Sequence, residues 1–202
     1  MPTIIGHALV GVGLLNLVKP ATEKSWYNPL LVSVVVLSML PDADVLGFRF
    51  GIKYSDPLGH RGFSHSLVFA AVTGVFASVP LVVLFHKRST PSIKQILIIY
   101  LTLATVTASH PLLDMLTDGG LGSALFAPFS WSRLFFSVTP IPVSPIGLRW
   151  SVGPVLAWEL LFFLPFFLGS FGLYSASIAK RWVAWGLTIF GTVGSFMFRI
   201  GF

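Results

Sequence analysis

Long apolar segments separated by loops constrain the fold of this chain more than any other feature. We place six of them, at residues 3–18, 27–41, 66–85, 94–113, 153–173 and 182–199. A helix needs about 20 apolar residues to cross the hydrocarbon core of a bilayer, and the last four segments reach that length within the error of their boundaries. The first two are shorter, so we expect them to tilt, to cross a thinned region or to be partly buried in the bundle.

Composition separates this chain from soluble proteins. Hydrophobic residues make up 54% of the 202 residues and only 10% are charged, whereas soluble domains carry about 25% charged residues. The net charge of +6 would fit a nucleic-acid partner, but the basic residues lie in loops between apolar segments, the pattern that orients membrane proteins. We therefore predict an all-α, polytopic membrane helix bundle of about six spans, one domain over residues 1–202, and no nucleic-acid partner.

Two loops, at 42–65 and 114–152, are much longer than the others. Both are rich in Gly, Pro and Ser, and the second contains Pro128, Pro140, Pro142 and Pro145 with aromatic residues between them. Closely spaced Gly and Pro residues favour turns over helices and strands. We expect the loops to form an ordered cap over one face of the bundle.

Histidine and acidic residues gather where these loops meet the apolar segments. They form Pro41-Asp42-Ala43-Asp44, His60-Arg61-Gly62-Phe63-Ser64-His65, and His110-Pro111-Leu112-Leu113-Asp114 with Asp118 just beyond, while His7 stands alone. Ionisable residues beside apolar segments are energetically unfavourable and mark functional sites. Because the chain has no cysteine, a metal site must use imidazole and carboxylate, the ligands of zinc, manganese and iron centres.

Six alternating spans bring every one of these residues to the same face of the membrane. The opposite face carries Lys19, Lys24, Lys87, Arg88, Lys94, Lys180 and Arg181 in short loops. The face with the ligand-type residues carries Arg49, Lys53, Arg61, Arg133, Arg149 and Arg199 across longer segments. Basic residues in short loops mark the cytoplasmic side, so we expect the site to open toward the periplasm or cell exterior.

Each cluster also has an interpretation without metal. Asp42 and Asp44 fit an Asx turn after a helix, although one aspartate would suffice for a turn. Ser64 fits the N-cap of the following helix, which still leaves the neighbouring histidines available as ligands. His110 and Asp114 share a helix face at i and i+4, so they fit either a helix-end hydrogen bond or a pair of ligands on one ion.

Four further residues each fit more than one role. His7 fits an interfacial histidine as well as a ligand, and Glu159 fits a ligand, a partner that orients a ligand histidine, or a hydrated group near the interface. Arg61 lies between two histidines and could clamp a phosphate or carboxylate through its planar fork. Asp118 could be a ligand or a general base, with Gly119 and Gly120 allowing close approach of substrate to the backbone.

These motifs, in this order, resemble the YdjM-like family of bacterial inner-membrane, metal-dependent hydrolases. The resemblance rests on His7, Pro41-Asp42-x-Asp44, His60-Arg61-Gly62-x-Ser64-His65-Ser66, His110-Pro111-x-x-Asp114, Thr117-Asp118-Gly119-Gly120, the Pro140–Pro145 stretch and the Glu159 region, and so covers nearly the whole chain. It implies a multi-pass protein of the inner membrane. The order of ligand types is also distantly similar to zinc-dependent phospholipase C and related nucleases, which implies a cluster of two or three zinc ions that hydrolyses a phosphoester. For this chain we expect one to three divalent metal ions, with zinc favoured.

We therefore expect a membrane-bound hydrolase that cleaves a phosphoester of a lipid or lipid-linked substrate with metal-activated water. The expected ligands are His7, Asp42, Asp44, His60, His65, His110 and Asp114.

A metal transporter is one alternative, but its ligands should lie near the membrane midplane. An intramembrane metalloprotease would carry His-Glu-x-x-His, which this sequence lacks. A non-catalytic regulatory membrane protein remains the third alternative.

Overall fold

The computed structural model describes residues 1–18, 24–87, 89–145 and 152–199. These residues form six α-helices: α1 (Ile4–Val18), α2 (Tyr27–Met39), α3 (Leu67–His86), α4 (Ile93–Met115), α5 (Val152–Gly172) and α6 (Ile178–Arg199). Three 3-10 segments join them, η2 (Lys24–Trp26), η3 (Leu40–Phe50) and η4 (Phe63–His65), and no β-strand occurs in the described ranges. The all-α prediction is confirmed. Lys19, Arg88 and Arg149, which entered the prediction of orientation, lie outside the described residues.

Each of the six predicted apolar segments corresponds to one of these helices. Four helical stretches are long and apolar enough to cross a membrane, namely Lys24–Phe50, α3, α4 and α5. Helix α1 is apolar but has only 15 residues, as expected for the short first segment. Helix α6 begins four residues before the predicted segment and so takes in Lys180 and Arg181. The fold is therefore a membrane helix bundle in which the number of complete spans is approximate.

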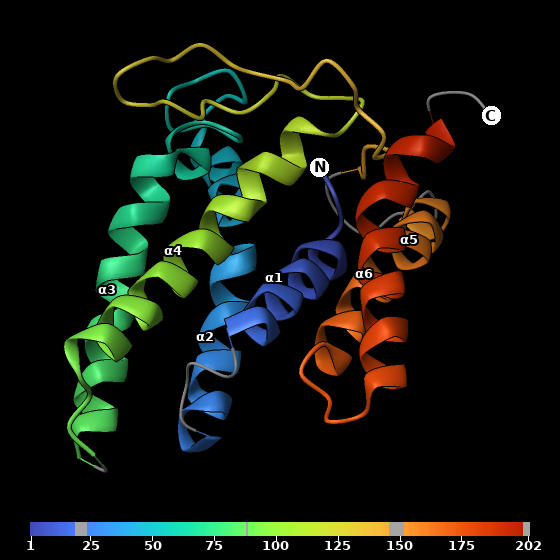
Figure 1. The fold of residues 1–202 in the computed structure, drawn as a ribbon. Helices are drawn as coiled ribbons and strands as arrows, with labels where there is room; N and C mark the ends of the chain where they lie inside the picture. Colours follow the sequence, from blue (N-terminus) through green and yellow to red (C-terminus); the bar gives the residue numbers. More distant parts are fainter. Residues whose placement is uncertain (19–23, 88, 146–151, 200–202) are drawn as a thin grey trace.

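Helices α1 and α2 lie between two helical hairpins (Figure 1). Helix α3 packs against α4 on one side, α5 packs against α6 on the other, and α1 contacts α2, α4 and α5. Leu15, Leu30, Phe85 and Leu103 form much of the core between α1, α2, α3 and α4. Small residues allow close contact between helices in membranes, and a Cβ at Gly74 would lie only 2.9 Å from the Cβ of Ala104.

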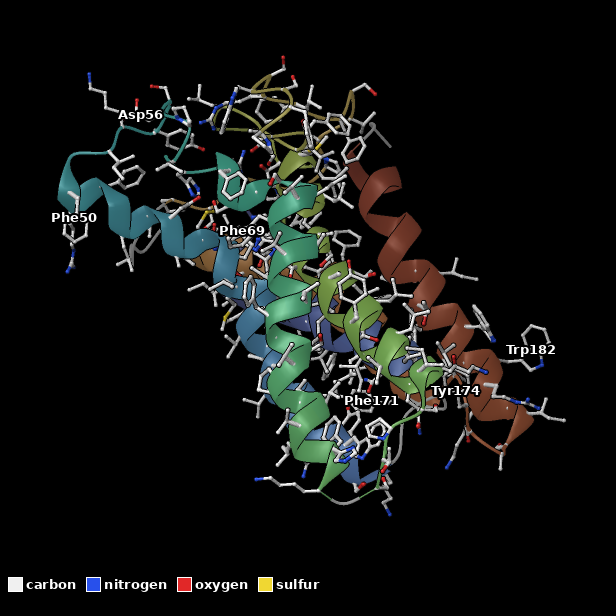
Figure 2. The ribbon with its side chains drawn as sticks, turned by 90° about the vertical axis from the view of Figure 1, so that its left-hand side faces the viewer. Phe50, Asp56, Phe69, Phe171, Tyr174 and Trp182 are labelled. Carbon is white, nitrogen blue, oxygen red and sulfur yellow. The ribbon has the colours of Figure 1, made fainter. Side chains whose placement is uncertain are left out.

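The loop predicted at 42–65 begins later than expected. Helix α2 ends at Met39, two residues before Pro41, and the chain then continues as the 3-10 segment η3 to Phe50, with Gly51 as its C-cap. Proline is tolerated at the start of a helical segment because its missing N–H would have no partner there, and Pro41 occupies such a position. Gly51 ends the segment with φ 80°, a conformation that suits glycine. Figure 2 shows η3 leading away from the bundle to Phe50.

The two loops cover one end of the bundle, at the top of Figure 1, as an ordered cap. Ser123 and Leu134 exchange backbone hydrogen bonds of 3.0 and 2.9 Å. Residues 136 and 141 donate to the last residues of α4 and its cap, Met115 and Leu116, at 3.0 Å each. These bonds fix the 116–144 segment against the end of α4, where the site lies.

Candidate metal centre

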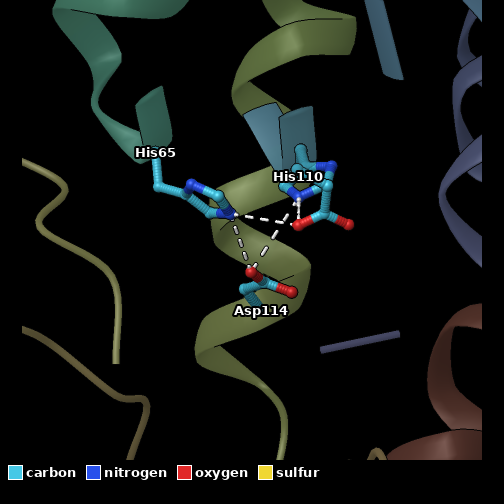
Figure 3. A group of neighbouring side chains, drawn as sticks. His65, His110 and Asp114 are labelled. Atoms are coloured by element: carbon cyan, nitrogen blue, oxygen red, sulfur yellow. Dashed lines mark ion pairs between the residues drawn. The ribbon is translucent and has the colours of Figure 1, made fainter. Parts of the chain in front are cut away.

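Four side chains from three parts of the chain converge under the cap. Asp42 lies in the first turn of η3, His65 ends η4, and His110 and Asp114 lie in the last two turns of α4. One donor atom from each lies within 4.8 Å of the others, and all four side chains are buried. Figure 3 shows the rings of His65 and His110 directed toward the carboxylate of Asp114.

The separations between these donor atoms suit a small cation. The Nε2 atom of His65 lies 3.1 Å from Asp114 Oδ2 and 3.6 Å from Asp42 Oδ1. The Nε2 atom of His110 lies 3.2 Å from Asp42 Oδ1 and 3.9 Å from Asp114 Oδ2. Ligands at zinc-like distances of about 2.0–2.1 Å in tetrahedral arrangement would be about 3.4 Å apart. The observed separations bracket that value, so the four residues fit such an ion.

In each of the two histidines, the hydrogen bond that Nδ1 makes determines whether Nε2 carries a proton or a free lone pair. His110 Nδ1 lies 2.7 Å from the carbonyl oxygen of Ser38, which can only accept, so Nδ1 carries a proton. His65 Nδ1 lies 3.0 Å from the Ser64 hydroxyl oxygen and 3.2 Å from Asp44 Oδ2. Because that hydroxyl donates to Asp44, it can accept a hydrogen bond from a proton on Nδ1. Both rings therefore direct Nε2 at the carboxylates of Asp42 and Asp114, an arrangement typical of metal-bound histidines held by a carbonyl or carboxylate.

These inward-facing atoms lack hydrogen-bond partners. Within the described part of the chain, none is found for His65 Nε2, His110 Nε2 or the four carboxylate oxygens of Asp42 and Asp114. Buried polar atoms are almost always satisfied, and two buried carboxylates beside imidazole lone pairs repel one another unless a positive charge lies between them. The geometry calls for a cation or for protons at this point.

The buried carboxylates of the cluster also shift the pKa of His65. Burial of the ring alone would lower this pKa, but the carboxylates of Asp114, Asp42 and Asp44 raise it well above the ordinary histidine value. Opposite charges at close range favour the charged form. The carboxylates thus stabilise positive charge on His65 itself, which is a proton when no metal is bound, and a divalent cation would have to displace that proton.

A second group of ligand-type residues adjoins the first and shares His65. It consists of Asp44, His60 and His65. Here both oxygens of Asp44 already have partners: His60 Nδ1 lies 2.7 Å from Oδ1, while the Ser64 hydroxyl donates to Oδ2 at 2.5 Å. The Arg61 backbone N–H also donates to Oδ2, at 3.2 Å. Asp44 thus orients both histidines, and its role as a direct ligand, like that of His60, stays a prediction. The expectation that Ser64 caps α3 is wrong, because Ser66 is the N-cap and accepts from Phe69 N at 3.0 Å.

His7 lies beside the first group. Its ring stacks on that of His110 with the centroids 3.7 Å apart, and its Nε2 lies 3.6 Å from Asp114 Oδ1. Among the described residues no hydrogen-bond partner is found for either ring nitrogen. His7 is therefore near enough to share the carboxylate of Asp114 as the expected additional ligand, a role that stays a prediction.

Arg61 is buried and engaged by the protein itself. Its Nε forms an ion pair with Asp114 Oδ2 at 3.2 Å, and its two terminal nitrogens donate to Gly119 O and Thr117 Oγ1 at 2.9 Å each. Gly120 adopts φ 88°, and a Cβ there would lie 2.9 Å from Arg61 Nη1. Arg61 holds Asp114 and the 117–120 turn together. Its predicted contact with substrate is untested.

Comparison with known proteins assigns the chain to a family. The sequence matches the YdjM inner membrane protein family over residues 1–199. The chain belongs to that family. It is also similar to the inner membrane protein YbcI of Escherichia coli strain K12, with 41% identity over 152 residues that span 73% of this chain and 80% of YbcI. No solved structure matches. The resemblance inferred from the motifs is confirmed, and with it the assignment to an inner membrane family.

Two further residues predicted for the site of this YdjM-family protein, Asp118 and Glu159, also lie outside both ligand groups. Asp118 is exposed and accepts a hydrogen bond of 2.8 Å from the Val143 backbone, which ties the cap together. Glu159 is buried and accepts from Thr3, from the backbone N–H at 2.6 Å and from the hydroxyl. Thr3 in turn caps α1, because its hydroxyl accepts from Gly6 N at 3.2 Å. Glu159 therefore positions the helix that carries His7.

Sequence reasoning missed several residues that support the site in this YdjM-family member. Arg133 donates to the backbone oxygens of His60, Tyr54 and Asp56 at 2.9–3.2 Å, which fixes the loop that holds His60. In the sequence it stands out only as one more basic residue in a long loop. Thr3 could have been found, because a threonine just before an apolar run is an N-cap signal. The Ser38 carbonyl, which bonds His110, could not have been found, because every residue has a backbone carbonyl and the sequence does not indicate which one lies beside a given side chain.

Proposed function

We propose that this protein is a membrane-bound, metal-dependent hydrolase that cleaves a phosphoester in the headgroup of a lipid or lipid-linked substrate. One observation carries the proposal: unsatisfied donor atoms of Asp42, His65, His110 and Asp114 face one another in a buried cluster. Zinc is the metal we propose, because the two imidazoles, two carboxylates and the donor spacing fit its usual coordination. The further ligand candidates His7, Asp44 and His60 allow one to three ions.

The depth of the site supports a lipid substrate. His65 lies two residues before the start of α3, and Asp114 lies one residue before the end of α4. Helix α3 has 20 residues, about 30 Å at 1.5 Å per residue, which equals the thickness of the hydrocarbon core. The ligand residues therefore lie near the boundary between hydrocarbon and headgroups, where a lipid phosphate would be presented.

The proposed chemistry divides between the ion and the protein. A bound divalent ion would acidify water and stabilise the developing charge on a phosphoryl oxygen. The Ser38 carbonyl would hold the proton of His110 on Nδ1, and the Ser64 hydroxyl together with Asp44 would hold that of His65 there, so that both Nε2 atoms are free to bind. Arg61 holds Asp114 in place. The carboxylate oxygen of Asp42 that does not bind the ion would accept a proton from water, as a general base does.

The direct test is metal content followed by hydrolysis. Elemental analysis of protein purified without chelator should find at least one zinc-type ion per chain, and His110→Ala should lower that content. His86→Ala is the matched control, because His86 is an exposed histidine at the opposite end of α3. A screen across phospholipids and polyprenyl phosphates should then reveal metal-dependent release of phosphate or headgroup. Metal-free protein, or metal-loaded protein inactive on all substrates, contradicts the proposal.

We propose further that the site faces away from the cytoplasm, as the distribution of basic residues in short loops indicates. The chain has no cysteine, so Ser55→Cys in the cap and Ser89→Cys in the opposite loop can be probed singly with an impermeant thiol reagent on intact cells. We expect labelling at position 55 and protection at position 89. The reverse result assigns the site to the cytoplasm, and labelling at both positions breaks the topology.

A further inference from the structure

The cap contains a turn whose composition is unusual for a water-exposed loop. Residues 119–132 include no charged side chain. Within this stretch Phe129 is 87% exposed, Phe126 51% and Trp131 45%. Extended exposed apolar surfaces on a protein mark a contact with another protein or with a membrane. We call residues 124–131, which contain these three side chains, the aromatic turn.

Hydrogen bonds fix the depth of the aromatic turn relative to the bundle. The N–H of Leu67, the first residue of α3, donates to the carbonyl of Leu125 at 3.0 Å. Because α3 matches the hydrocarbon thickness in length, Leu125 lies at the hydrocarbon boundary. The turn is compact: Phe129 N and Ser130 N both donate to Phe126 O at 3.0 Å. Phe126 and Phe129 are therefore held within a few residues of that boundary.

The apolar surface of the turn continues from an apolar helix. Between its ends, α3 exposes Val72, Phe76, Val79 and Val83, side chains that face lipid in a membrane bundle. Aromatic residues are enriched at the level of the headgroups, where their rings are partly apolar and partly hydrated. Helix α3 exposes aliphatic side chains, and the aromatic turn bonded to its first residue exposes aromatic ones. This is the order expected of a protein surface that contacts first acyl chains and then headgroups.

We propose that the aromatic turn is immersed in the headgroup and upper acyl region of the leaflet on the site side, although it belongs to no spanning helix. The partner is the bilayer itself. The absence of charge in 119–132, the depth set by Leu67 and the continuity with α3 favour lipid over a protein partner. Phe126, Phe129 and Trp131 act as anchors, and the cap lies against the membrane instead of extending into bulk water.

Immersion of the turn has a consequence for the site. Ala124 N donates to Arg61 O at 2.9 Å, and the Ser123 hydroxyl donates to Pro111 O at 3.4 Å. The turn is therefore bonded to the loop that carries His60 and His65, and Ser123 just before it is bonded to the helix that carries His110 and Asp114. A lipid headgroup beside the turn would then lie next to the two elements that hold the ligand residues. This consequence rests on the proposed function, whereas the immersion of the turn does not.

Spin labels on single cysteines test the immersion directly. The full-length chain without native cysteine is reconstituted in vesicles of phosphatidylcholine and phosphatidylglycerol, with a nitroxide at Phe129→Cys or, as a second variant, at Phe126→Cys. Phe129 is 87% exposed whereas Phe126 is half-exposed, so Phe129→Cys, which removes the least packing, is the primary variant. Collision rates with oxygen, which concentrates in lipid, are compared with those of a water-soluble nickel chelate.

Two further labels calibrate the scale. Phe76→Cys on the exposed side of α3 reports lipid, and Ser55→Cys in the exposed cap loop reports water. We expect the ratio of oxygen to nickel collisions at positions 129 and 126 to be several-fold above that at position 55 and close to that at position 76. A ratio equal to that at position 55 overturns the proposal, because the turn is then in water. Protection from both reagents also overturns it, because a protein then covers the turn. Neither readout depends on metal or activity.

Discussion

The two ends of the helix bundle bury polar side chains in opposite ways. At the end away from the cap, Asn16 donates to the Ser170 hydroxyl at 2.9 Å and accepts from the Tyr27 hydroxyl at 2.7 Å, while Ser170 donates to Phe167 O at 2.6 Å. The polar side chains of this Asn16 network are hydrogen-bonded to one another. Under the cap, the carboxylate oxygens of Asp42 and Asp114 and the Nε2 atoms of His65 and His110 face one another without a hydrogen-bond partner among the described residues.

This difference distinguishes buried polar residues that hold helices together from buried polar residues that can bind a ligand. The Asn16 network joins α1, α2 and α5, and a satisfied network of this kind holds helices together in a membrane. The cluster around Asp114 gathers two buried carboxylates, of which Asp114 is ion-paired with Arg61 at 3.2 Å; burying this much charge is unfavourable unless a further cation or proton compensates it. A fold retains such a cluster where it binds something. Four predictions test whether the two ends behave as this comparison requires, in order of decreasing effect.

The largest effect should follow the loss of a direct ligand. We expect Asp114→Asn to weaken zinc affinity by more than about 100-fold, since even the partners that only orient ligands contribute 10- to 100-fold. Calorimetric titration of the purified protein with zinc measures the change. Asp56→Asn is the matched control, because Asp56 lies in the cap outside both ligand groups and accepts from Lys53 N. Equal affinity in both variants would place the metal elsewhere.

Removal of metal should destabilise the whole bundle. A ligand present at 100 to 1,000 times its Kd stabilises the native state by about 3–4 kcal/mol, so a chelator should lower the unfolding temperature of the wild type. The same chelator should leave the unfolding temperature of Asp114→Asn unchanged. Thermal unfolding followed by circular dichroism in detergent measures both. An unaffected wild type would mean that protons, and not a metal, neutralise the cluster.

An intermediate effect should follow the loss of an orienting carboxylate. We expect Asp44→Asn to weaken zinc affinity about 10- to 100-fold, because it disturbs His65 through Nδ1 while leaving the Nε2 side in place. The same titration measures this, with Asp56→Asn again as control. A loss as large as that of Asp114→Asn would indicate that Asp44 binds metal directly, as its place in the Asp-x-Asp motif suggests.

The smallest effect should follow a substitution in the hydrogen-bonded Asn16 network, at the end of the bundle away from the cap. Asn16→Ala removes the acceptor of the Tyr27 hydroxyl and the donor to Ser170, and hydrogen bonds between membrane helices contribute about 0.6 kcal/mol each on average. We therefore expect about 1 kcal/mol lower unfolding free energy and no change in zinc affinity. Unfolding in mixed micelles and zinc titration measure the two quantities. A change in zinc affinity would show that the two ends are coupled.

The sequence determined the helices and the kinds of ligand available. Hydropathy alone sufficed to find all six helices, because a bilayer demands apolar segments of nearly fixed length. The clusters around Asp42, His65 and His110 were visible because charge is so rare in this chain. The chain order of these motifs by itself also indicated the YdjM family.

Only the tertiary structure decided what each ligand-type residue does. Asp42 and Asp44 are two positions apart on a 3-10 segment with about three residues per turn, so their side chains point about 120° apart. One meets His110, the other His60 and Ser64. Both aspartates look alike in the sequence because the side chains that distinguish them come from distant parts of the chain.

The same reason accounts for Arg61 and Glu159. Arg61 is buried against Thr117 and Gly119, and Glu159 against Thr3, across separations of 56 to 156 residues. Local periodicity reports which residues share a face of one helix, but it carries no information about which face of another helix lies opposite. Packing between elements settles that question, and with it the difference between a carboxylate that already has its hydrogen bonds and one that needs a cation.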